Sequence, residues 1–175
     1  MTAADVELRH YTHEDLADIR QTLLDVHDEV YADDMTEFRR RFPWFVDHWG
    51  NKPGFSCLIG YDHGEPVGYC YGAPAVPGRE WWREFVHPAP EKTRTFAVSE
   101  LMVRKPWRKT GTSRLLHHTL LADRDVDLAV LTVNTATPKV QKVYESWGYR
   151  KVGEQQPFPD SPLYAVMLAE LPLAD

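Results

Sequence analysis

Apolar residues recur along this chain with two different periods, and the alternation of these periods predicts a mixed α/β protein. Val6 and Leu8 alternate with charged neighbours, which predicts a strand over Val6–Tyr11. Thr12 and Asp15 then form a capping box. The next apolar residues recur at helical spacing and predict an amphipathic helix of about five turns: Leu16, Ile19, Leu23, Val26 and Val30.

The rest of the chain divides into elements in the same way. Thr36 predicts the start of a second helix through about His48, which Pro43 kinks or ends early. The later elements are a hairpin of two strands (Ser56–Tyr61, Val67–Tyr71), a strand (Phe96–Val103), a helix to about Asp123, a strand (Leu128–Val133), a helix from Pro138 to Gly148, and two strands (Tyr149–Val152, Leu163–Leu168). This order, with early antiparallel strands and a central βαβ crossover, predicts a mixed sheet with helices on both faces. We expect one domain over residues 1–175.

Between the hairpin and the next strand lies a long proline-rich segment, Pro74–Thr95. It carries Trp81, Trp82 and Phe85, and a short helix is predicted around Glu80–Val86. Long loops in compact domains often serve as lids or binding loops. Two interpretations stay open, an apolar lid over a binding site or a contact between the two copies of a homodimer.

The excess of acidic residues in this chain limits the classes of partner that it can bind. A formal net charge of −6 argues against a nucleic-acid binder, because such affinity depends on clustered cations. No apolar run approaches the ~20 residues that span a bilayer, and the first residues do not resemble a signal peptide, so we expect no membrane partner. Cys57 and Cys70 lie in apolar runs, which favours reduced thiols in a cytoplasmic protein, although a disulfide between them stays open. No set of histidines has the spacing of metal ligands, so we expect no metal.

One segment departs from this acidic balance. Cations crowd between Arg104 and Arg114, after the strand Phe96–Val103 and before a leucine-rich helix. A loop that opens a helix presents free backbone N–H groups and the positive end of the helix dipole, which together suit a phosphate. Gly111 would let a phosphate approach the backbone closely. The alternative is a solvated basic turn with a helix-capping glycine.

The same loop resembles the signature of the GNAT superfamily of acyl-CoA-dependent N-acyltransferases. That signature, Arg/Gln-x-x-Gly-x-Gly/Ala between a strand and a helix, is matched by Arg108-Lys109-Thr110-Gly111-Thr112-Ser113. The downstream strand, the helix that carries Tyr144 and the run Trp147-Gly148-Tyr149 are also similar to the family. Two positions depart from it. Ser113 stands where the family has Gly or Ala, and Thr137 stands where an Asn is common, with Asn134 three residues earlier.

The resemblance implies a GNAT-like fold, in which a mostly antiparallel sheet splays at one parallel pair to hold acetyl-CoA. By the same resemblance, the cosubstrate contacts Leu101, Met102, Val103, Arg108, Lys109, Thr110, Gly111, Thr112, Ser113, Asn134 and Thr137. It also assigns two catalytic residues. Glu100 would take a proton from the acceptor amine, and Tyr144 would protonate the departing thiolate.

The residues themselves leave alternatives for both assignments. Glu100 shares a strand face with apolar neighbours, so we expect a raised pKa that suits a general base. A structural carboxylate paired with an arginine or exposed at a sheet edge is the other interpretation. Tyr144 lies at helical spacing with apolar residues, as an ordinary core aromatic also would.

The acceptor side is predicted around an acidic run between Asp25 and Glu37, which would attract a cationic amine or form a solvated helix face. By the resemblance, the acceptor contacts are Asp28, Tyr31, Asp33, Trp81 and Trp82. The predicted function is acetyl transfer from acetyl-CoA to a primary amine of a small molecule or peptide, by direct attack in a ternary complex. A catalytically weak acyl-CoA-binding or sensing module is the alternative, motivated by Ser113 and Thr137.

Overall fold

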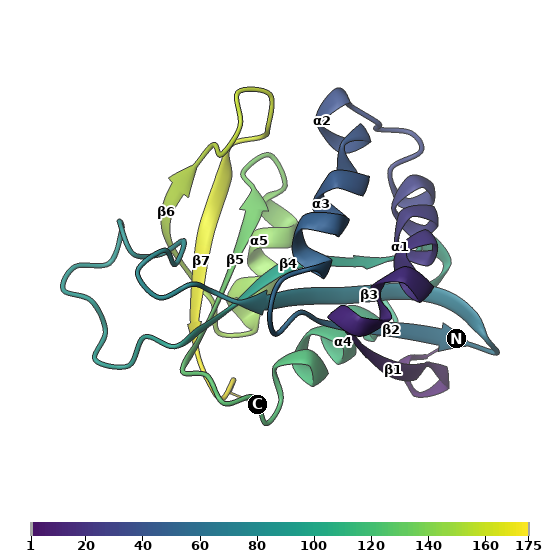
Figure 1. Cartoon of the computed structure of the whole chain (residues 1–175), viewed down its shortest axis with the longest axis horizontal. Coiled ribbons are helices and arrows are strands. Elements are labelled where there is room, and N and C mark those ends of the chain that lie inside the picture. The colour runs from purple at the N-terminus through teal and green to yellow at the C-terminus, as the bar shows by residue number, and fades with distance from the viewer. Residues whose placement is uncertain (1, 175) are drawn as a thin grey trace. The chain divides into compact units, whose positions relative to one another are not determined.

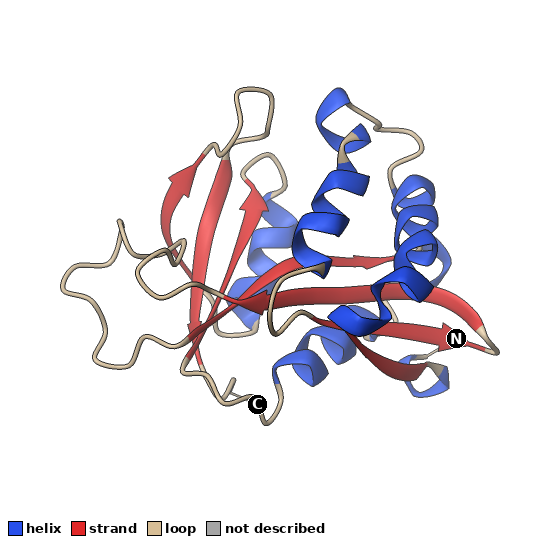
Figure 2. Cartoon of the chain, viewed as in Figure 1, coloured by secondary structure: helices blue, strands red, loops and turns tan. Residues whose placement is uncertain are grey.

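Seven strands form a mixed sheet in the order β1-β2-β3-β4-β5-β7-β6 (Figure 2). The structure is a computed structural model that describes residues 2–174 without the side chain of Ala4, so both ends of the predicted domain, Met1 and Asp175, lie outside the described residues. The strands are β1 (Glu7–Thr12), β2 (Ser56–Asp62), β3 (Glu65–Pro74), β4 (Thr95–Val103), β5 (Leu128–Asn134), β6 (Arg150–Gln155) and β7 (Tyr164–Glu170). The helices are α1 (Leu16–Val30), α2 (Glu37–Arg40), α3 (Phe42–Gly50), α4 (Thr112–Leu121) and α5 (Pro138–Ser146), with short 3₁₀ turns at Ala3–Asp5, His13–Asp15 and Lys105–Trp107.

The described chain divides into two compact units, which we describe one at a time. The first unit joins the chain up to Ala73 to Ser99–Leu120, and the second joins Pro74–Val98 to the chain from Leu121 onward. Strand β4 contributes its first residues to the second unit and its last residues to the first. The single domain expected over residues 1–175 therefore stays a prediction.

In the first unit, β1, β2 and β3 form an antiparallel ladder. Figure 1 shows α1 and α3 on one side of β2 and β3, with α4 on the other. The apolar face of α1 packs into a core with α3 and the strands, as its helical spacing predicts. The β2–β3 turn is tighter than the expected five residues. His63 and Gly64 both have left-handed backbone angles (φ 50° and 82°), which suit a two-residue hairpin turn.

The predicted second helix is broken in two. The Thr36 hydroxyl caps α2 by accepting a hydrogen bond from the Arg39 N–H at 3.1 Å. The helix ends at Arg40, and α3 begins at Phe42 with Pro43 in its first turn. A proline lacks the N–H of a helix interior but fits a first turn, so Pro43 lies at the start of a new helix, where the pattern predicted one helix that Pro43 kinks or ends early.

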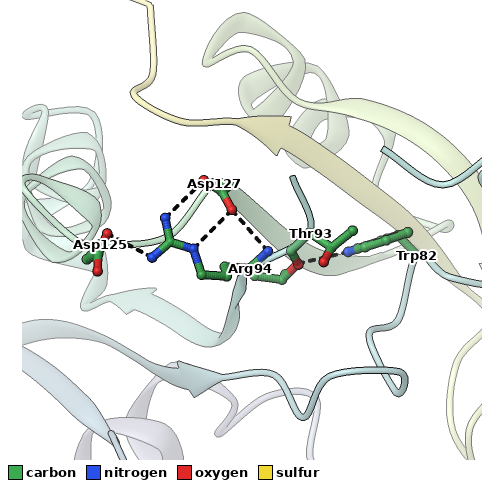
Figure 3. A network of polar contacts seen from close by, with 6 residues as sticks. Trp82, Thr93, Arg94, Asp125 and Asp127 are labelled. Atoms are coloured by element: carbon green, nitrogen blue, oxygen red, sulfur yellow. Dashed lines mark hydrogen bonds and ion pairs between the residues drawn. The ribbon is translucent and has the colours of Figure 1, made fainter. Parts of the chain in front are cut away.

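In the second unit, β7 lies between β5 and β6 and pairs antiparallel with both, and α5 packs on β5. Strand β4 pairs parallel with β5 from Thr95 opposite Leu128 to Ala97 opposite Val130. Figure 3 shows the polar network beside this pair. The Arg94 side chain donates to both carboxylate oxygens of Asp127 at 3.2 and 3.3 Å, and the Arg94 carbonyl accepts from the Asp127 and Leu128 N–H groups. These bonds set the parallel register.

The long proline-rich segment has no helix at Glu80–Val86, contrary to the prediction. It forms successive turns there, held by the ion pair of Arg83 with the buried Glu80. The Trp82 side chain is fully buried, and its indole N–H donates to the Thr95 hydroxyl at 3.0 Å (Figure 3). Phe85 packs so closely on Gly153 that a methyl group there would come within 2.3 Å of its ring. Contacts of the Trp82 and Phe85 rings therefore hold this segment in place, where a helix would be held by its backbone hydrogen bonds.

Candidate active site

The basic loop after β4 is folded into a shape that suits an anion. Lys109 and Gly111 both take left-handed backbone angles (φ 61° and 87°) on either side of Thr110. Such alternation turns successive backbone N–H groups toward one point, and the first N–H groups of α4 lack intrahelical partners. The Thr110 hydroxyl donates to the Trp107 carbonyl at 2.6 Å and lies 2.7 Å from the Thr112 hydroxyl. The loop is therefore rigidly preformed where the sequence predicts a phosphate site.

Three contacts hold this loop to the rest of the first unit. The Trp107 indole N–H donates to the Asp62 carboxylate at 3.0 Å. The Arg108 Nε donates to the Val103 carbonyl at 3.0 Å, and the Ala3 N–H donates to the Thr110 carbonyl at 3.2 Å. The charged ends of Arg108 and Lys109 belong to exposed residues, so both cations can meet a bound phosphate.

Arg104 does not serve the role that its place in the basic cluster suggests. Its guanidinium forms ion pairs with Glu29 at 2.5 Å and Glu65 at 2.7 Å, and it also donates to the Pro66 carbonyl. These carboxylates raise the pKa of Arg104, and the side chain is only 18% exposed. The charge of Arg104 is therefore paired with carboxylates of the first unit, although Arg104 belongs to the basic cluster that the sequence predicts as a phosphate site.

Replacing Arg104 by methionine is expected to lower the free energy of unfolding by about 1–3 kcal/mol, because charge-assisted hydrogen bonds to both carboxylates are lost. Acetyl-CoA affinity is expected to stay within about twofold of the parent, since a remote charge in water is largely screened. Urea unfolding and calorimetric titration measure the two quantities. Lys109→Met is the matched control, because Lys109 is an exposed cation of the same loop, and in this variant the affinity falls and the unfolding free energy changes little.

Glu100 lies near the end of β4 on the face that carries Met102, a member of the core under α1 and α3. Its desolvation by the surrounding protein raises the pKa of Glu100 to about 7, and the positive charge of Arg39 offsets part of that rise. The predicted raised pKa is therefore present. At neutral pH such a carboxylate is partly ionised and can accept a proton from an ammonium group.

The first unit gathers side chains around Glu100 that the sequence did not connect. The charge of Glu100 is felt by Tyr31, whose pKa is raised mainly by burial and then by this carboxylate. Tyr31, a predicted acceptor contact, lies at the end of α1, and the Arg39 guanidinium stacks on its ring at 4.6 Å. Arg39 was missed because nothing in its local pattern distinguishes it from the neighbouring arginines. Only the turn from α1 into α2 brings it here.

The acidic run is largely neutralised by arginines. Asp34 pairs with Arg39 at 3.0 Å, and Glu37 pairs with Arg40. Glu29 pairs with Arg104. The predicted contacts Asp28 and Asp33 are both exposed, and Asp28 lies 3.5 Å from the Nδ1 of His27. The wall that would attract a cationic acceptor thus carries much less net charge than the sequence indicates.

The backbone of β4 alternates between its two neighbours beyond Glu100. The Met102 carbonyl faces β3, where a methyl group on Gly68 would come within 2.5 Å of it. The Arg104 N–H also turns to β3 and donates to the Val67 carbonyl at 2.8 Å. Because successive residues of a strand direct their polar groups to opposite edges, those of Leu101 and Val103 turn away from β3. Of the three predicted pantetheine contacts on β4, Leu101 and Val103 have suitable direction and Met102 does not.

The second unit contains the remaining predicted site residues. The Asn134 Oδ1 accepts from the Ala136 N–H at 2.9 Å, and the Thr137 hydroxyl donates to the Asn134 carbonyl at 2.7 Å. Both residues thereby shape the turn that starts α5. Tyr144 is partly buried on α5, with its ring edge-on to Trp147 at 5.2 Å and to Tyr149 at 5.7 Å. These contacts hold its ring in place.

The two predicted tryptophan contacts differ in position. Trp81 is partly exposed, whereas Trp82 is fully buried and bonded to Thr95. A fully buried ring cannot contact an acceptor without opening the second unit. The structure thus assigns Trp82 to the core of the unit and leaves Trp81 as the candidate on this loop.

Known proteins resemble this chain in both sequence family and fold. Residues 89–162 match the family model of the acetyltransferase (GNAT) domain, a range that includes β4, the basic loop and α5. This part of the chain is similar to a GNAT acetyltransferase domain. The mixed sheet with its one parallel pair, β4 and β5, is the GNAT fold, as the resemblance of the loop predicts.

Solved structures are similar to this chain over nearly its whole length. The NAA60 protein of Arabidopsis thaliana, solved with a bisubstrate analogue, has a TM-score of 0.67 at 14% identity and covers 95% of this chain and 99% of that chain. An acetyltransferase from Thermus thermophilus has a TM-score of 0.66 at 18% identity, covering 98% and 100%. The paia N-acetyltransferase of Thermoplasma acidophilum, solved with coenzyme A, has a TM-score of 0.59 at 12% identity, covering 94% and 98%. A search of curated proteins finds no match.

The match to the family model and the fold together indicate an acyl-CoA-dependent N-acetyltransferase, and the NAA60 protein of Arabidopsis thaliana was also solved with acetyl-CoA. The preformed loop at Lys109 and Gly111 fits the phosphates of such a cosubstrate. Within residues 2–174, no group of three His, Cys, Asp or Glu side chains is placed to hold a metal ion. No helix in that range is long and apolar enough to cross a membrane.

Proposed function

We propose that this protein transfers the acetyl group of acetyl-CoA to a primary amine of a small molecule or peptide, by direct attack in a ternary complex. The observation that carries the proposal is the partly buried Glu100, whose pKa is raised to about 7 beside the predicted acceptor contact Tyr31. An ammonium group must lose a proton before its nitrogen can attack a thioester. A carboxylate with a pKa near the working pH is suited to that transfer.

In the proposed reaction, Glu100 takes the first proton from the acceptor ammonium. The amine lone pair then attacks the thioester carbon, and the carbon–sulfur bond breaks. The departing thiolate takes the phenol proton of Tyr144, and the nitrogen of the new amide loses its second proton, which restores the phenol. Both cysteines are buried on β2 and β3, which supports direct attack over an acyl-cysteine intermediate.

For the cosubstrate, the proposal keeps the loop residues Arg108 to Ser113 for the phosphates and the backbones of Leu101 and Val103 for the pantetheine amides. Asn134 and Thr137 shape the turn before α5, and we propose that they reach the pantetheine arm from it. Ser113, which departs from the family signature, keeps a small side chain at the start of α4. Its hydroxyl adds a donor beside the phosphate site.

For the acceptor, the proposal keeps Asp28, Tyr31, Asp33 and Trp81 and omits Trp82. Because arginines neutralise Glu29, Asp34 and Glu37, we favour an acceptor with one ammonium group over a polycation. We also propose a cytoplasmic location, which is supported because Cys57 and Cys70 are buried thiols and do not form a disulfide.

The experiment begins with calorimetric titration of the purified protein with acetyl-CoA, and with ATP for comparison. A panel of small amines and peptide N-termini is then screened for release of the CoA thiol. We expect acetyl-CoA to bind more tightly than ATP and at least one amine to be acetylated. Binding without transfer to any amine would favour the acyl-CoA-binding or sensing module instead.

Tyr144→Phe tests the proposed acid. Removal of the hydroxyl is expected to lower kcat about 10- to 100-fold, because the thiolate then departs without a proton donor. The melting temperature and acetyl-CoA affinity are expected to stay near those of the parent, since the ring contacts remain. Tyr149→Phe, which changes the neighbouring ring just before β6, is the control and should keep kcat. Equal kcat in the two variants would remove Tyr144 from the mechanism.

A further inference from the structure

Tyr71 on β3 carries a buried hydroxyl that the proposed mechanism does not use. Its side chain is fully buried, and within residues 2–174 no protein atom has hydrogen-bond geometry to its oxygen. The neighbouring Tyr69 differs. Its ring stacks on Tyr71 at 5.9 Å, but its hydroxyl donates to the Leu23 carbonyl at 2.9 Å. Burial of a hydroxyl without a partner is costly, so such a group calls for a functional reason.

Strand pairing places Tyr71 beside Glu100. The Arg104 N–H donates to the Val67 carbonyl, and the Ala75 N–H donates to the Thr95 carbonyl, so β3 and β4 run antiparallel. Counting from Val67 opposite Arg104 brings Tyr69 opposite Met102, and both belong to one core cluster. The same count brings Tyr71 opposite Glu100, whereas counting from Ala75 opposite Thr95 brings it opposite Ser99, because β4 has one extra residue between these two bonds. Tyr71 therefore faces the residue pair Ser99 and Glu100. Side chains of residues that lie opposite each other share one face of a sheet and are about 5 Å apart at Cβ.

Charges around Tyr71 agree with this position. Burial foremost, and then the Glu100 carboxylate, raise the pKa of the Tyr71 phenol well above its usual range. Cys57, opposite Tyr71 on β2, also contributes, and its own thiol pKa is raised by burial. The Ser99 side chain, which approaches the phenol without reaching normal hydrogen-bond geometry, lowers its pKa by hydrogen bonding to a lesser degree. On the helical side, Arg39 on α2 lowers the pKa of Glu100, and the Glu100 carboxylate raises the pKa of Tyr31 at the end of α1. The phenol therefore stays protonated, and toward a carboxylate it can only donate.

We propose that Tyr71 is a positioning residue for Glu100, whose buried hydroxyl donates a hydrogen bond to the ionised carboxylate, directly or through one water molecule. This inference rests on the proposed function of Glu100 as the base. The bond orients the carboxylate toward the ammonium and favours its charged form. When Glu100 takes the proton, the bond weakens, because a neutral acid is a poorer acceptor.

Tyr71→Phe tests the proposal, with Tyr69→Phe as the matched control. In Tyr71→Phe, we expect kcat to fall about tenfold and the midpoint of the pH dependence of kcat/KM to rise by about one pH unit, since a donor to the charged form is lost. At pH 5, where Glu100 is mainly protonated, the melting temperature should match that of the parent, because the bond to the charged carboxylate is then largely absent. Tyr69→Phe should show the reverse, with a lower melting temperature and an unchanged midpoint.

A second readout does not depend on activity. The side-chain carboxyl of Glu100 can be titrated by ¹³C NMR in the parent and in Tyr71→Phe, with Glu100→Gln to assign the signal. We expect the Glu100 pKa to rise in Tyr71→Phe. If no amine is acetylated but this pKa rises, the contact of Tyr71 with Glu100 stands and the proposed base role fails. If neither the pKa nor the pH midpoint moves, Tyr71 is a packing residue and the inference is wrong.

Discussion

Replacing Glu100 by glutamine is expected to lower kcat/KM for amine acetylation about 100- to 10,000-fold, the range that removal of a general base produces. Glutamine keeps the shape and polarity of the side chain but cannot accept the proton of an ammonium group. Affinity for acetyl-CoA should be unchanged, because the phosphate loop lies elsewhere on the chain. Initial rates at saturating acetyl-CoA, with the amine varied, measure the effect.

The pH dependence of kcat/KM in the parent should report the ionisation of Glu100. Because burial raises the pKa of Glu100 to about 7, kcat/KM should rise as the pH increases through about 7, and this step should be missing in Glu100→Gln. Glu154→Gln, an exposed glutamate on β6 paired with Lys151, is the control and should keep both rate and profile. A Glu100→Gln enzyme as fast as the parent at pH 8 would exclude the proposed base.

Glu100→Gln, which is expected to lower activity, should raise the stability of the folded state. The folded state holds the Glu100 proton more tightly than the unfolded chain, so it binds more protons between pH 4.5, the ordinary value, and pH 7. Stability therefore falls as pH rises through this window, and the full penalty is present above pH 7. Glu100→Gln removes the charge, so its melting temperature should exceed that of the parent at pH 8 and match it at pH 4. A base that costs stability is typical of active sites.

Replacing Gly111 by valine is expected to weaken acetyl-CoA binding about 100-fold or more, which corresponds to the loss of about two charge-assisted hydrogen bonds. Gly111 has φ 87°, a backbone angle that a β-branched residue strongly disfavours. The loop must shift to accommodate valine, and its N–H groups then no longer point to one phosphate. Calorimetric titration with acetyl-CoA measures the loss directly.

Gly64→Val separates this effect from general strain. Gly64 has a similar angle, φ 82°, in the β2–β3 turn, and nothing lies within 4 Å of a side chain placed there. At Gly111 the nearest atom, the Ala3 Cβ, is at an ordinary 3.6 Å. Both variants should therefore lose about 1–3 kcal/mol of unfolding free energy from backbone strain. Only Gly111→Val should lose acetyl-CoA affinity, and equal affinities in the two variants would contradict a phosphate loop.

Features that depend on contiguous residues could be predicted from the sequence. The strand before the basic loop, the left-handed glycine within it and the helix after it follow one another along the chain. Their bonds are short-range, such as the Thr110 hydroxyl to the Trp107 carbonyl. The capping box of Thr12 and Asp15 is also present, with the Asp15 carboxylate accepting from the Thr12 N–H at 2.8 Å. Local hydrogen bonds and hydrophobic periods are properties of a segment, so the segment alone predicts them.

Charge and burial at single side chains depended instead on residues distant in sequence. Arg104 meets Glu29 and Glu65, which are 75 and 39 positions away, so a cation counted for phosphate serves the fold. Trp82, expected as a lid, is buried because the start of β4 supplies the Thr95 hydroxyl. The sequence by itself determined the order of elements, the glycine-containing loop that leads into α4, and Glu100 as a carboxylate among apolar neighbours. Only the tertiary structure decided which charges are neutralised and that Tyr31, Arg39 and Tyr71 surround that carboxylate, because ion pairing and desolvation depend on which segments pack together.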